Sequence, residues 1–204
     1  MEFQDVVRKR RMVRHFTPEP VPASTVKRII STAQRAPSAG FSQGVSFVVV
    51  TEEALRKQVG TACSEETYVE AGYAPFISEA PVQIVICTSE EIYHSRYNEA
   101  DKKPEGQDEI AWPVPYWHTD AGCSLMLVLL AAVNEGLGSA FVGAPDPARL
   151  QEILGIPEEF VPIGVAMIGH PAPDKRSPSL KRGRRRVEDV MHLNGWGSAA
   201  SDTP

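Results

Sequence analysis

Residues 116–143 read YWHTDAGCSLMLVLLAAVNEGLGSAFVG, and this stretch decides the fold. Residues 116–135 predict one long helix, whose middle, residues 125–133, is apolar on nearly every face. A helix of this kind must be covered on all sides, which places it either in a protein core or at a subunit interface. The glycines that follow can adopt the positive φ that ends a helix, and residues 139–143 then predict a strand.

Short strands and helices are predicted on both sides of this helix. Buried strands are indicated by β-branched runs such as SFVVVT and PVQIVICT, and helices by apolar residues three and four positions apart. The expected strands are residues 46–51, 81–88, 139–143 and 161–169, and the expected helices are 3–7, 26–36, 52–63, 116–135 and 147–154. Strands that alternate with helices, without an internal repeat, predict an α/β or α+β fold.

Three segments lack a clear pattern. Residues 89–115 are polar and rich in charge and proline, and we interpret them as a long surface segment of the kind that forms a flexible lid. Residues 64–79 are weakly patterned, and the tail, about 197–204, is expected to be weakly ordered.

The composition is that of an ordinary globular protein. Of the 204 residues, 42% are hydrophobic and 23% charged, which suffices for a single domain over residues 1–204 with a full core. The longest apolar run has nine residues, fewer than the ~20 of a membrane helix. The first residues, MEFQD, show no secretion signal, and three cysteines without a CxxC motif argue against disulfides or a zinc site. We therefore expect a cytoplasmic protein.

Positive charge is concentrated in two short clusters. The net charge is −5, yet residues 8–14 (the first basic cluster) and 181–186 (the second) hold 10 of the 21 lysines and arginines and no acid. The rest of the chain carries 11 basic against 26 acidic groups, whereas a nucleic-acid-binding protein more often has a broadly basic face. The two clusters fit one small, highly charged anion such as a phosphate group, or else two solvated segments that never meet.

Motifs for catalysis by side chains are missing. The sequence contains no GxGxxG after a strand, no GxxxxGK, no HExxH and no GxSxG, and its five histidines lack metal-ligand spacing. Cys63 or Cys123 is better interpreted as a buried, inert thiol than as a nucleophile. Asp120, near the start of the long helix, is most simply a partner of the helix dipole. An enzyme with this sequence would take its chemistry from a cofactor.

Five segments carry a resemblance to a known family. They are residues 8–16 (RKRRMVRHF), 35–43 (RAPSAGFSQ) followed by an FVVV strand, 134–143 (NEGLGSAFVG), 161–171 (VPIGVAMIGHP), and a tail with Arg182, Arg184, VEDV and Trp196. In order and spacing these segments resemble the nitroreductase-like flavoproteins, and the resemblance covers essentially the whole chain.

The resemblance implies an α+β fold of three layers. A central mixed, mostly antiparallel sheet would be flanked by helices, with residues 116–135 as a long central dimer helix. The protein would be a homodimer with two FMN sites at the interface, each built from both subunits. Both basic clusters would then converge on one FMN phosphate, since guanidinium groups suit phosphate oxygens.

The resemblance assigns three parts of the chain to FMN. Arginines would bind the phosphate, a loop would reach the flavin of the neighbouring subunit, and backbone N–H groups would contact the flavin ring. These cofactor-binding residues are Arg10, Arg11, Arg14, Arg182 and Arg184 for the phosphate, Pro37, Ser38, Ala39, Gly40 and Gln43 in the loop, and Val142 and Gly143 on a strand. Phe41, Trp112 and Tyr116 would line the substrate pocket, and no metal is expected.

The sequence departs from the family pattern in a few places. Phe41 stands where Asn is usual, Gly44 and Val45 where Pro-Trp is usual, and Met12 where a small hydroxyl residue is common. Phe41 would narrow or deepen the pocket over the flavin ring and favour apolar or aromatic substrates, or it would signal a changed cofactor mode. Met12 removes one candidate hydrogen bond to the flavin.

The implied activity is a ping-pong oxidoreduction on FMN. NADH or NADPH would be the donor, and a nitroaromatic, a quinone or an activated alkene the acceptor. A reductive dehalogenase, a flavin-destroying enzyme and a non-catalytic flavin-binding or flavin-sequestering protein are alternatives with the same fold. A nucleic-acid-binding protein with a basic tail would show DNA affinity that falls steeply with salt. We expect neither nucleic acid nor membrane as a partner.

Overall fold

The computed structural model describes residues 1–198, and the chain divides into two compact units. They are Met1–Asp174 and Lys175–Pro204. The single domain expected over residues 1–204 stays a prediction. Of the predicted weakly ordered tail, Gly197 lies in a turn with φ 86°, and residues 199–204 lie outside the described residues.

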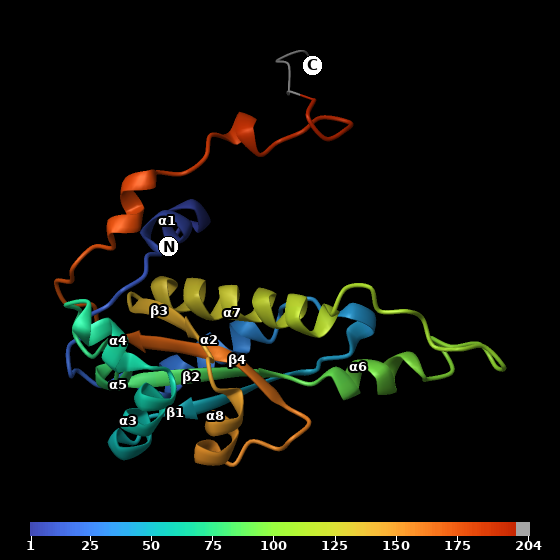
Figure 1. The fold of residues 1–204 in the computed structure, drawn as a ribbon, viewed down its shortest axis with the longest axis horizontal. Helices are drawn as coiled ribbons and strands as arrows, with labels where there is room; N and C mark the ends of the chain where they lie inside the picture. The colour runs from blue at the N-terminus through green and yellow to red at the C-terminus, as the bar shows by residue number, and fades with distance from the viewer. Residues whose placement is uncertain (199–204) are drawn as a thin grey trace. The chain divides into compact units, whose positions relative to one another are not determined.

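A four-stranded antiparallel sheet forms the centre of the first unit (Figure 1). Its strands are β1 (Val45–Val50), β2 (Val82–Thr88), β3 (Gly138–Gly143) and β4 (Val161–Gly169), in the spatial order β1-β2-β4-β3. All three pairings are antiparallel, and Val85 of β2 lies opposite Val48 on one side and Val165 on the other. The resemblance implied a mixed sheet. Within residues 1–198, the one parallel pairing is an isolated bridge between Met12 and Ser139 of β3.

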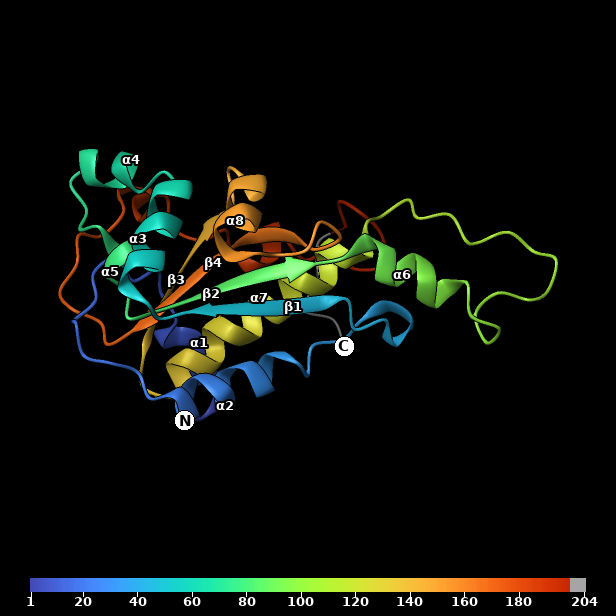
Figure 2. The same ribbon diagram turned by 90° about the horizontal axis from the view of Figure 1, so that it is seen from below.

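Helices cover both faces of the sheet and complete the three expected layers (Figures 1 and 2). One face packs against α2 (Ala23–Ala33) and α7 (Tyr116–Asn134), and the other against α3 (Glu53–Ala62), α5 (Phe76–Glu79) and α8 (Pro147–Leu154). The alternation of side chains on β2 explains the arrangement. Ile84 belongs to the core under α2 and α7, whereas its neighbour Val85 belongs to the core under α3 and α8.

Helix α7 combines a buried face with an exposed one. Ala121, Val128 and Ala132 are fully buried in the core with α2. A stripe of partly or fully exposed apolar side chains, which we call the α7 stripe, follows the other face: Cys123, Met126, Leu127 and Leu130. Although its longest apolar run is short, α7 is the one helix among the described residues whose length and composition would allow it to cross a membrane. Core helices meet the same criterion.

Helices also occur where the sequence predicted none. α4 (Glu65–Glu70) and α5 occupy the weakly patterned stretch 64–79, and α6 (Glu90–Tyr97) begins the segment 89–115 that was expected to be irregular. Tyr93 is the only buried residue of α6, so this helix has no apolar periodicity that would reveal it. Residues 98–115 contain neither helix nor strand, and their role as a lid stays a prediction.

The second unit contains two short 3-10 helices. They are η2 (Pro178–Arg182) and η3 (Val187–Asp189), and no side chain between Lys175 and Ser198 is buried. Arg186 donates a hydrogen bond to Asp189 at 3.0 Å, so part of the second basic cluster is neutralised locally.

Candidate functional site

The first basic cluster leaves helix α1 (Phe3–Lys9) and runs along the open edge of the sheet. The Val13 N–H donates to the Ser139 carbonyl at 3.0 Å, and the Phe141 N–H donates to the Met12 sulfur at 3.3 Å. Met12, which replaces a hydroxyl residue of the family pattern, therefore covers an edge N–H of β3. This pairing places the arginines that flank Met12 beside β3.

Arg11 is engaged by a buried carboxylate. One Arg11 nitrogen donates to both oxygens of Asp174 at 2.7 Å, and the side chain of Asp174 is only 7% exposed. The same carboxylate accepts the backbone N–H of Arg14 at 2.7 Å. Burial alone raises the pKa of Asp174, but the bonds from Arg14 and Arg11 bring that pKa below its ordinary value. Asp174 thus fastens the end of the first unit to the first basic cluster.

Arg14 presents a guanidinium whose bonding is incomplete. Its guanidinium carbon lies 5.1 Å from the centre of the Tyr73 ring. Its Nε is buried and has no hydrogen-bond partner within the described residues. A buried cationic N–H without an acceptor is costly, so an anionic oxygen at this place would be strongly favoured. The neighbouring side chain of Arg10 is half-buried and makes no hydrogen bond or ion pair within residues 1–198.

The end of β3 offers a backbone N–H on the same open edge of the sheet along which the first basic cluster runs. N–H groups of an antiparallel edge strand alternate between the partner strand and the open side. Since the Phe141 N–H faces Met12 on the open side, the N–H of the exposed Gly143 lies on that side too, and that of Val142 faces β4. Gly143 therefore has the free donor, and contact of both residues with a flavin stays a prediction.

The loop of residues 38–43, which includes the short helix η1 (Ala39–Phe41), has an unusual backbone. Gly40, Phe41 and Gln43 all adopt positive φ, between 55° and 61°. Left-handed backbone angles of this kind are strained for residues that carry a side chain, and an aromatic residue adopts them only rarely. A Cβ at Gly40 would lie 2.6 Å from the Tyr97 ring, so only glycine fits there.

The 38–43 loop is held by two side chains from other elements. The Ala39 N–H donates to Asp120 of α7 at 2.8 Å, and Arg96 of α6 donates to the Gly40 carbonyl at 3.0 Å. Gly44, which replaces the usual proline, has the Tyr93 ring 2.6 Å from the position of a Cβ. Glycine in place of the usual proline at position 44 therefore leaves room for the Tyr93 ring of α6.

A pocket of about 270 Å³ lies between this loop and α7. It is lined by Gln34, Ala36, Pro37, Ser38, Phe41, Gln43, Val45, Phe47 and Ser124. The predicted loop residues Pro37, Ser38 and Gln43 thus share one concave surface with Phe41, whereas Ala39 and Gly40 lie outside its lining. Phe41 itself is 73% exposed, which is unusual for an aromatic side chain on a strained backbone.

Aromatic residues connect the loop to the segment after α6. The Trp112 ring lies 4.7 Å from the Tyr97 ring and 6.2 Å from the Tyr116 ring, measured between centroids. Since Tyr97 also contacts Gly40, the predicted pocket residues Trp112 and Tyr116 lie at the same end of the first unit as the loop. Whether they line a substrate pocket stays a prediction.

A carboxylate fastens residues 98–115 to α6. Glu109 accepts the Trp112 indole N–H at 2.6 Å and is hydrogen-bonded to His94 Nδ1 at 2.6 Å. The bond to Glu109 raises the pKa of His94, and the bonds from Trp112 and then His94 lower the pKa of Glu109. We call these three residues the α6 clasp.

The two groups of predicted flavin residues occupy opposite ends of the first unit. Figures 1 and 2 show the 38–43 loop beside α6 at one end, and the segment between α1 and α2, with Arg10 to Arg14, toward the other. One chain therefore does not bring the loop and the first basic cluster together. Arg182 and Arg184 are exposed and belong to the second unit.

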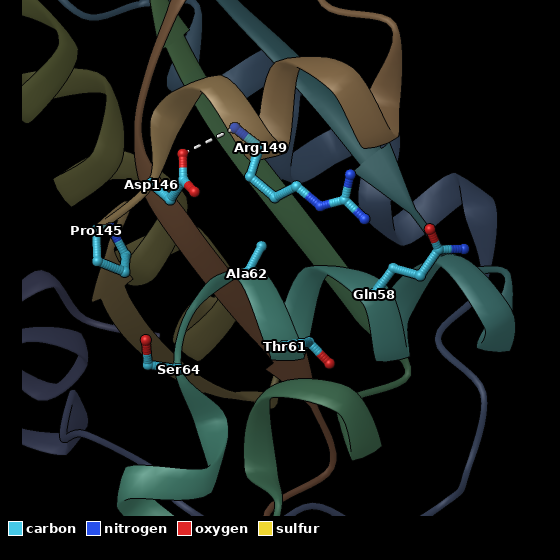
Figure 3. Close-up of a pocket in the computed structure, with 7 residues that line it drawn as sticks. All are labelled: Gln58, Thr61, Ala62, Ser64, Pro145, Asp146 and Arg149. Carbon is cyan, nitrogen blue, oxygen red and sulfur yellow. Dashed lines mark hydrogen bonds between the residues drawn. The ribbon is translucent and has the colours of Figure 1, made fainter.

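A further pocket of about 540 Å³ lies near the end of β3 (Figure 3). It is lined by Gln58, Thr61, Ala62, Ser64, Pro145, Asp146 and Arg149. Asp146 caps α8 by accepting the Arg149 N–H at 3.0 Å, and the figure shows the Arg149 side chain extending toward α3. No sequence motif pointed to this pocket, because its residues are ordinary polar surface types in distant segments.

The cysteines and possible metal ligands add no catalytic group. Burial raises the pKa of Cys63 and of Cys87 to about 12, which fits inert thiols. Cys123, expected to be buried, is only half-buried because it lies on the α7 stripe. The residues that the structure describes contain no cluster of three or more metal-ligating side chains.

Sequence reasoning missed the residues that support the loop. Asp120 is not simply a partner of the helix dipole, because its carboxylate is buried and bonded to Ala39 and to the Tyr93 hydroxyl. Arg96 and Asp174 also went unnoticed. A buried charge inside an apolar helix was the available signal for Asp120, since such a group requires partners.

Comparisons with known proteins agree with this architecture. The profile of the Nitroreductase family matches residues 7–170. An FMN reductase (NAD(P)H) of Bacillus subtilis is 29% identical over 191 residues, covering 89% of this chain and 69% of the relative. An iodotyrosine deiodinase of Nematostella vectensis is 28% identical over 215 residues, covering 94% of this chain and 75% of the relative.

Solved structures share the fold. The NADPH:FMN oxidoreductase of Vibrio harveyi, complexed with NAD⁺, superposes with a TM-score of 0.72 at 24% identity, covering 95% of this chain and 77% of that chain. The chain belongs to the Nitroreductase family.

Proposed function

We propose that this protein is an FMN-dependent NAD(P)H oxidoreductase that reduces a small electrophilic acceptor in a ping-pong cycle. Family membership and relatives named FMN reductase and NADPH-flavin oxidoreductase support the assignment. When bound, FMN would supply the redox chemistry that links oxidation of NADH or NADPH to reduction of the acceptor. The chain itself binds, orients and shields these molecules.

The observation that carries the proposal is the unpartnered Nε of Arg14. It is a buried cationic donor, and it lies in the segment that runs along β3, as the half-buried Arg10 does. The FMN phosphate supplies the oxygens that such donors need. We propose Arg10 and Arg14 as phosphate ligands, with Arg182 and Arg184 of the second unit, and the Gly143 N–H as a donor to the flavin ring. Arg11 is already bonded to Asp174, so we do not propose it as a phosphate ligand.

We propose a homodimer in which the loop of one subunit completes the site of the other. The loop and the first basic cluster lie at opposite ends of the first unit, so one chain alone does not assemble the site (Figure 2). The α7 stripe leaves apolar side chains such as Met126 exposed on the central helix. Burial of this stripe against a second α7 would remove it from water.

The acceptor would enter beside the aromatic residues near the loop. Phe41, Trp112 and Tyr116 offer flat apolar surfaces, which favour a planar acceptor such as a nitroaromatic or a quinone. An activated alkene remains within the same chemistry. Burial holds Cys63 and Cys87 as inert thiols, and we assign protonation to water.

Reductive dehalogenation is the second candidate. The Nematostella vectensis relative is an iodotyrosine deiodinase, and Trp112 together with Tyr97 of α6 offers a surface on which a halogenated ring would stack. A non-catalytic flavin-binding protein is the alternative without turnover. Localisation in the cytoplasm and the absence of a nucleic-acid partner stay predictions from the sequence.

Steady-state kinetics with FMN-loaded protein test the proposal. NADPH and NADH are each varied against a quinone, a nitroaromatic and an iodinated tyrosine. Parallel lines in double-reciprocal plots with the quinone or nitroaromatic support the ping-pong oxidoreductase. Iodide release without quinone turnover would favour dehalogenation, and flavin binding without any turnover would favour the non-catalytic alternative. DNA binding that disappears at moderate salt would indicate a role for the basic clusters other than FMN.

A further inference from the structure

Asp120 holds the 38–43 loop from the side of helix α7. One carboxylate oxygen accepts both the Ala39 N–H and the Tyr93 hydroxyl, each at 2.8 Å. The residue is only 6% exposed, and it lies within the same helix that carries the α7 stripe. A buried carboxylate bonded to a loop amide fixes the direction of that amide, because leaving either group unpaired is costly.

The loop requires such an external support. Phe41 and Gln43 have φ of 59° and 55°, values that side-chain-bearing residues adopt only when the surroundings impose them. Phe41 is also exposed, so burial of its own side chain does not hold this conformation. Within the loop, the Gln43 N–H donates to the Ser38 hydroxyl at 3.1 Å, which closes the turn but does not anchor it to the protein.

Asp120 and Arg96 fix the two ends of one short backbone segment. Asp120 binds the N–H of Ala39, and Arg96 binds the carbonyl of Gly40, the next residue. Arg96 is in turn held by Asp101 at 2.6 Å. The strained turn thus begins where hydrogen bonds from α7 and α6 both hold the backbone, and Phe41 is the next residue.

We infer that Asp120 is a positioning residue for the flavin site across the dimer, an inference that rests on the proposed function. It holds the 38–43 loop in the conformation that presents Ser38 and Gln43, together with the preceding Pro37, to the flavin of the partner subunit. Asp120 touches neither cofactor nor acceptor in this role. Its position on α7 also ties the loop to the helix that we propose as the dimer interface.

Hydrogen exchange and FMN titration of the same variants test this role. Asp120→Ala removes the acceptor, whereas Asp120→Asn keeps a carbonyl oxygen that can accept from Ala39. In Asp120→Ala, amides of residues 38–43 are expected to exchange faster in the FMN-free protein, and FMN to bind about tenfold more weakly. Asp120→Asn should restore both values to within about twofold of the wild type. Tyr93→Phe, which leaves the Ala39 bond in place, gives the milder variant should Asp120→Ala not fold, with a smaller rise in loop exchange.

Glu65→Ala is the matched control. Glu65 is another buried carboxylate, and it accepts the N–H groups of Ile77 and Ser78 at 2.6 and 2.8 Å, away from the loop. Its loss should lower the melting temperature without changing loop exchange or FMN affinity. Unchanged loop exchange in Asp120→Ala, or an equal loss of FMN affinity in Glu65→Ala, would overturn the inference. If the wild type takes up no FMN, the proposed function fails, while the exchange data still decide whether Asp120 anchors the loop.

Discussion

Replacing Arg14 by methionine separates FMN binding from stability. Methionine keeps an unbranched apolar stem of similar reach but removes the guanidinium, whose Nε is buried and unpartnered. The FMN-free protein loses a contact with Tyr73 worth about 0.5–1 kcal/mol. It is also relieved of a buried unsatisfied N–H, which costs about 1–3 kcal/mol. We therefore expect its free energy of unfolding to stay the same or to rise by up to about 2.5 kcal/mol.

FMN binding should respond very differently. A charge-assisted hydrogen bond to a phosphate contributes about 1.5–3 kcal/mol, so the dissociation constant should rise about 10- to 150-fold. The assay is quenching of flavin fluorescence on titration of FMN-free protein at fixed salt, with thermal unfolding of the same samples measured alongside.

Arg11→Met is the control with the opposite profile. It leaves the carboxylate of Asp174, 7% exposed, with only the Arg14 N–H as partner, and we expect a loss of about 1–3 kcal/mol of stability. FMN affinity should stay within about threefold at 0.15 M salt, because the lost charge acts only through screened solvent. Equal FMN affinities of wild type and Arg14→Met, or a larger loss in Arg11→Met, would refute the reasoning.

Three further predictions concern the clasp, the loop and the interface. The pKa of His94 is raised by Glu109, so the stabilisation of the α6 clasp is complete below the unfolded value of about 6.5 and is lost as pH rises through the folded value. Tryptophan fluorescence should therefore change as the pH rises above about 6.5, the unfolded pKa of histidine. Gly40→Ala adds positive-φ strain and a Cβ 2.6 Å from Tyr97, which should cost about 2–4 kcal/mol of stability by thermal unfolding. Met126→Lys puts a charge on the α7 stripe, and sedimentation should show a shift from dimer to monomer.

Each of these variants has a control in the same chain. A pH profile of fluorescence that is identical in His94→Gln would remove the clasp from the explanation. Gly106→Ala has the same kind of backbone strain, φ 80°, but nothing within 4 Å of the added Cβ, so it should cost only about 1 kcal/mol. Val49→Lys adds a charge at a similarly exposed apolar side chain on β1, and a dimer that dissociates equally in both variants would speak against the α7 stripe.

Elements with strong local signals were predictable to the residue. Helix α8 (Pro147–Leu154) begins with an Asp146 cap and a proline and ends at Gly155 with φ 61°, and its predicted bounds agree with the structure. Helices α4 and α5 were missed because six and four residues are too short for periodicity, and their form depends on packing.

The candidate site shows a similar division. The resemblance identified the 38–43 loop by its residues, but its strained conformation depends on Asp120, 81 positions further along the chain. Likewise, Arg11 and Arg14 look equivalent in the sequence, and only the distant Asp174 distinguishes them. Contacts between such separated residues have no local pattern, so the sequence alone does not reveal which arginine is free to bind an anion.

The most direct test of the central claim is the visible absorption spectrum of the purified protein, incubated with FMN and desalted, before and after NADPH is added without oxygen. We predict that oxidised flavin stays with the protein and that its visible band bleaches on addition of NADPH. A protein that retains no flavin, or a bound flavin that neither NADPH nor NADH reduces, would contradict the account.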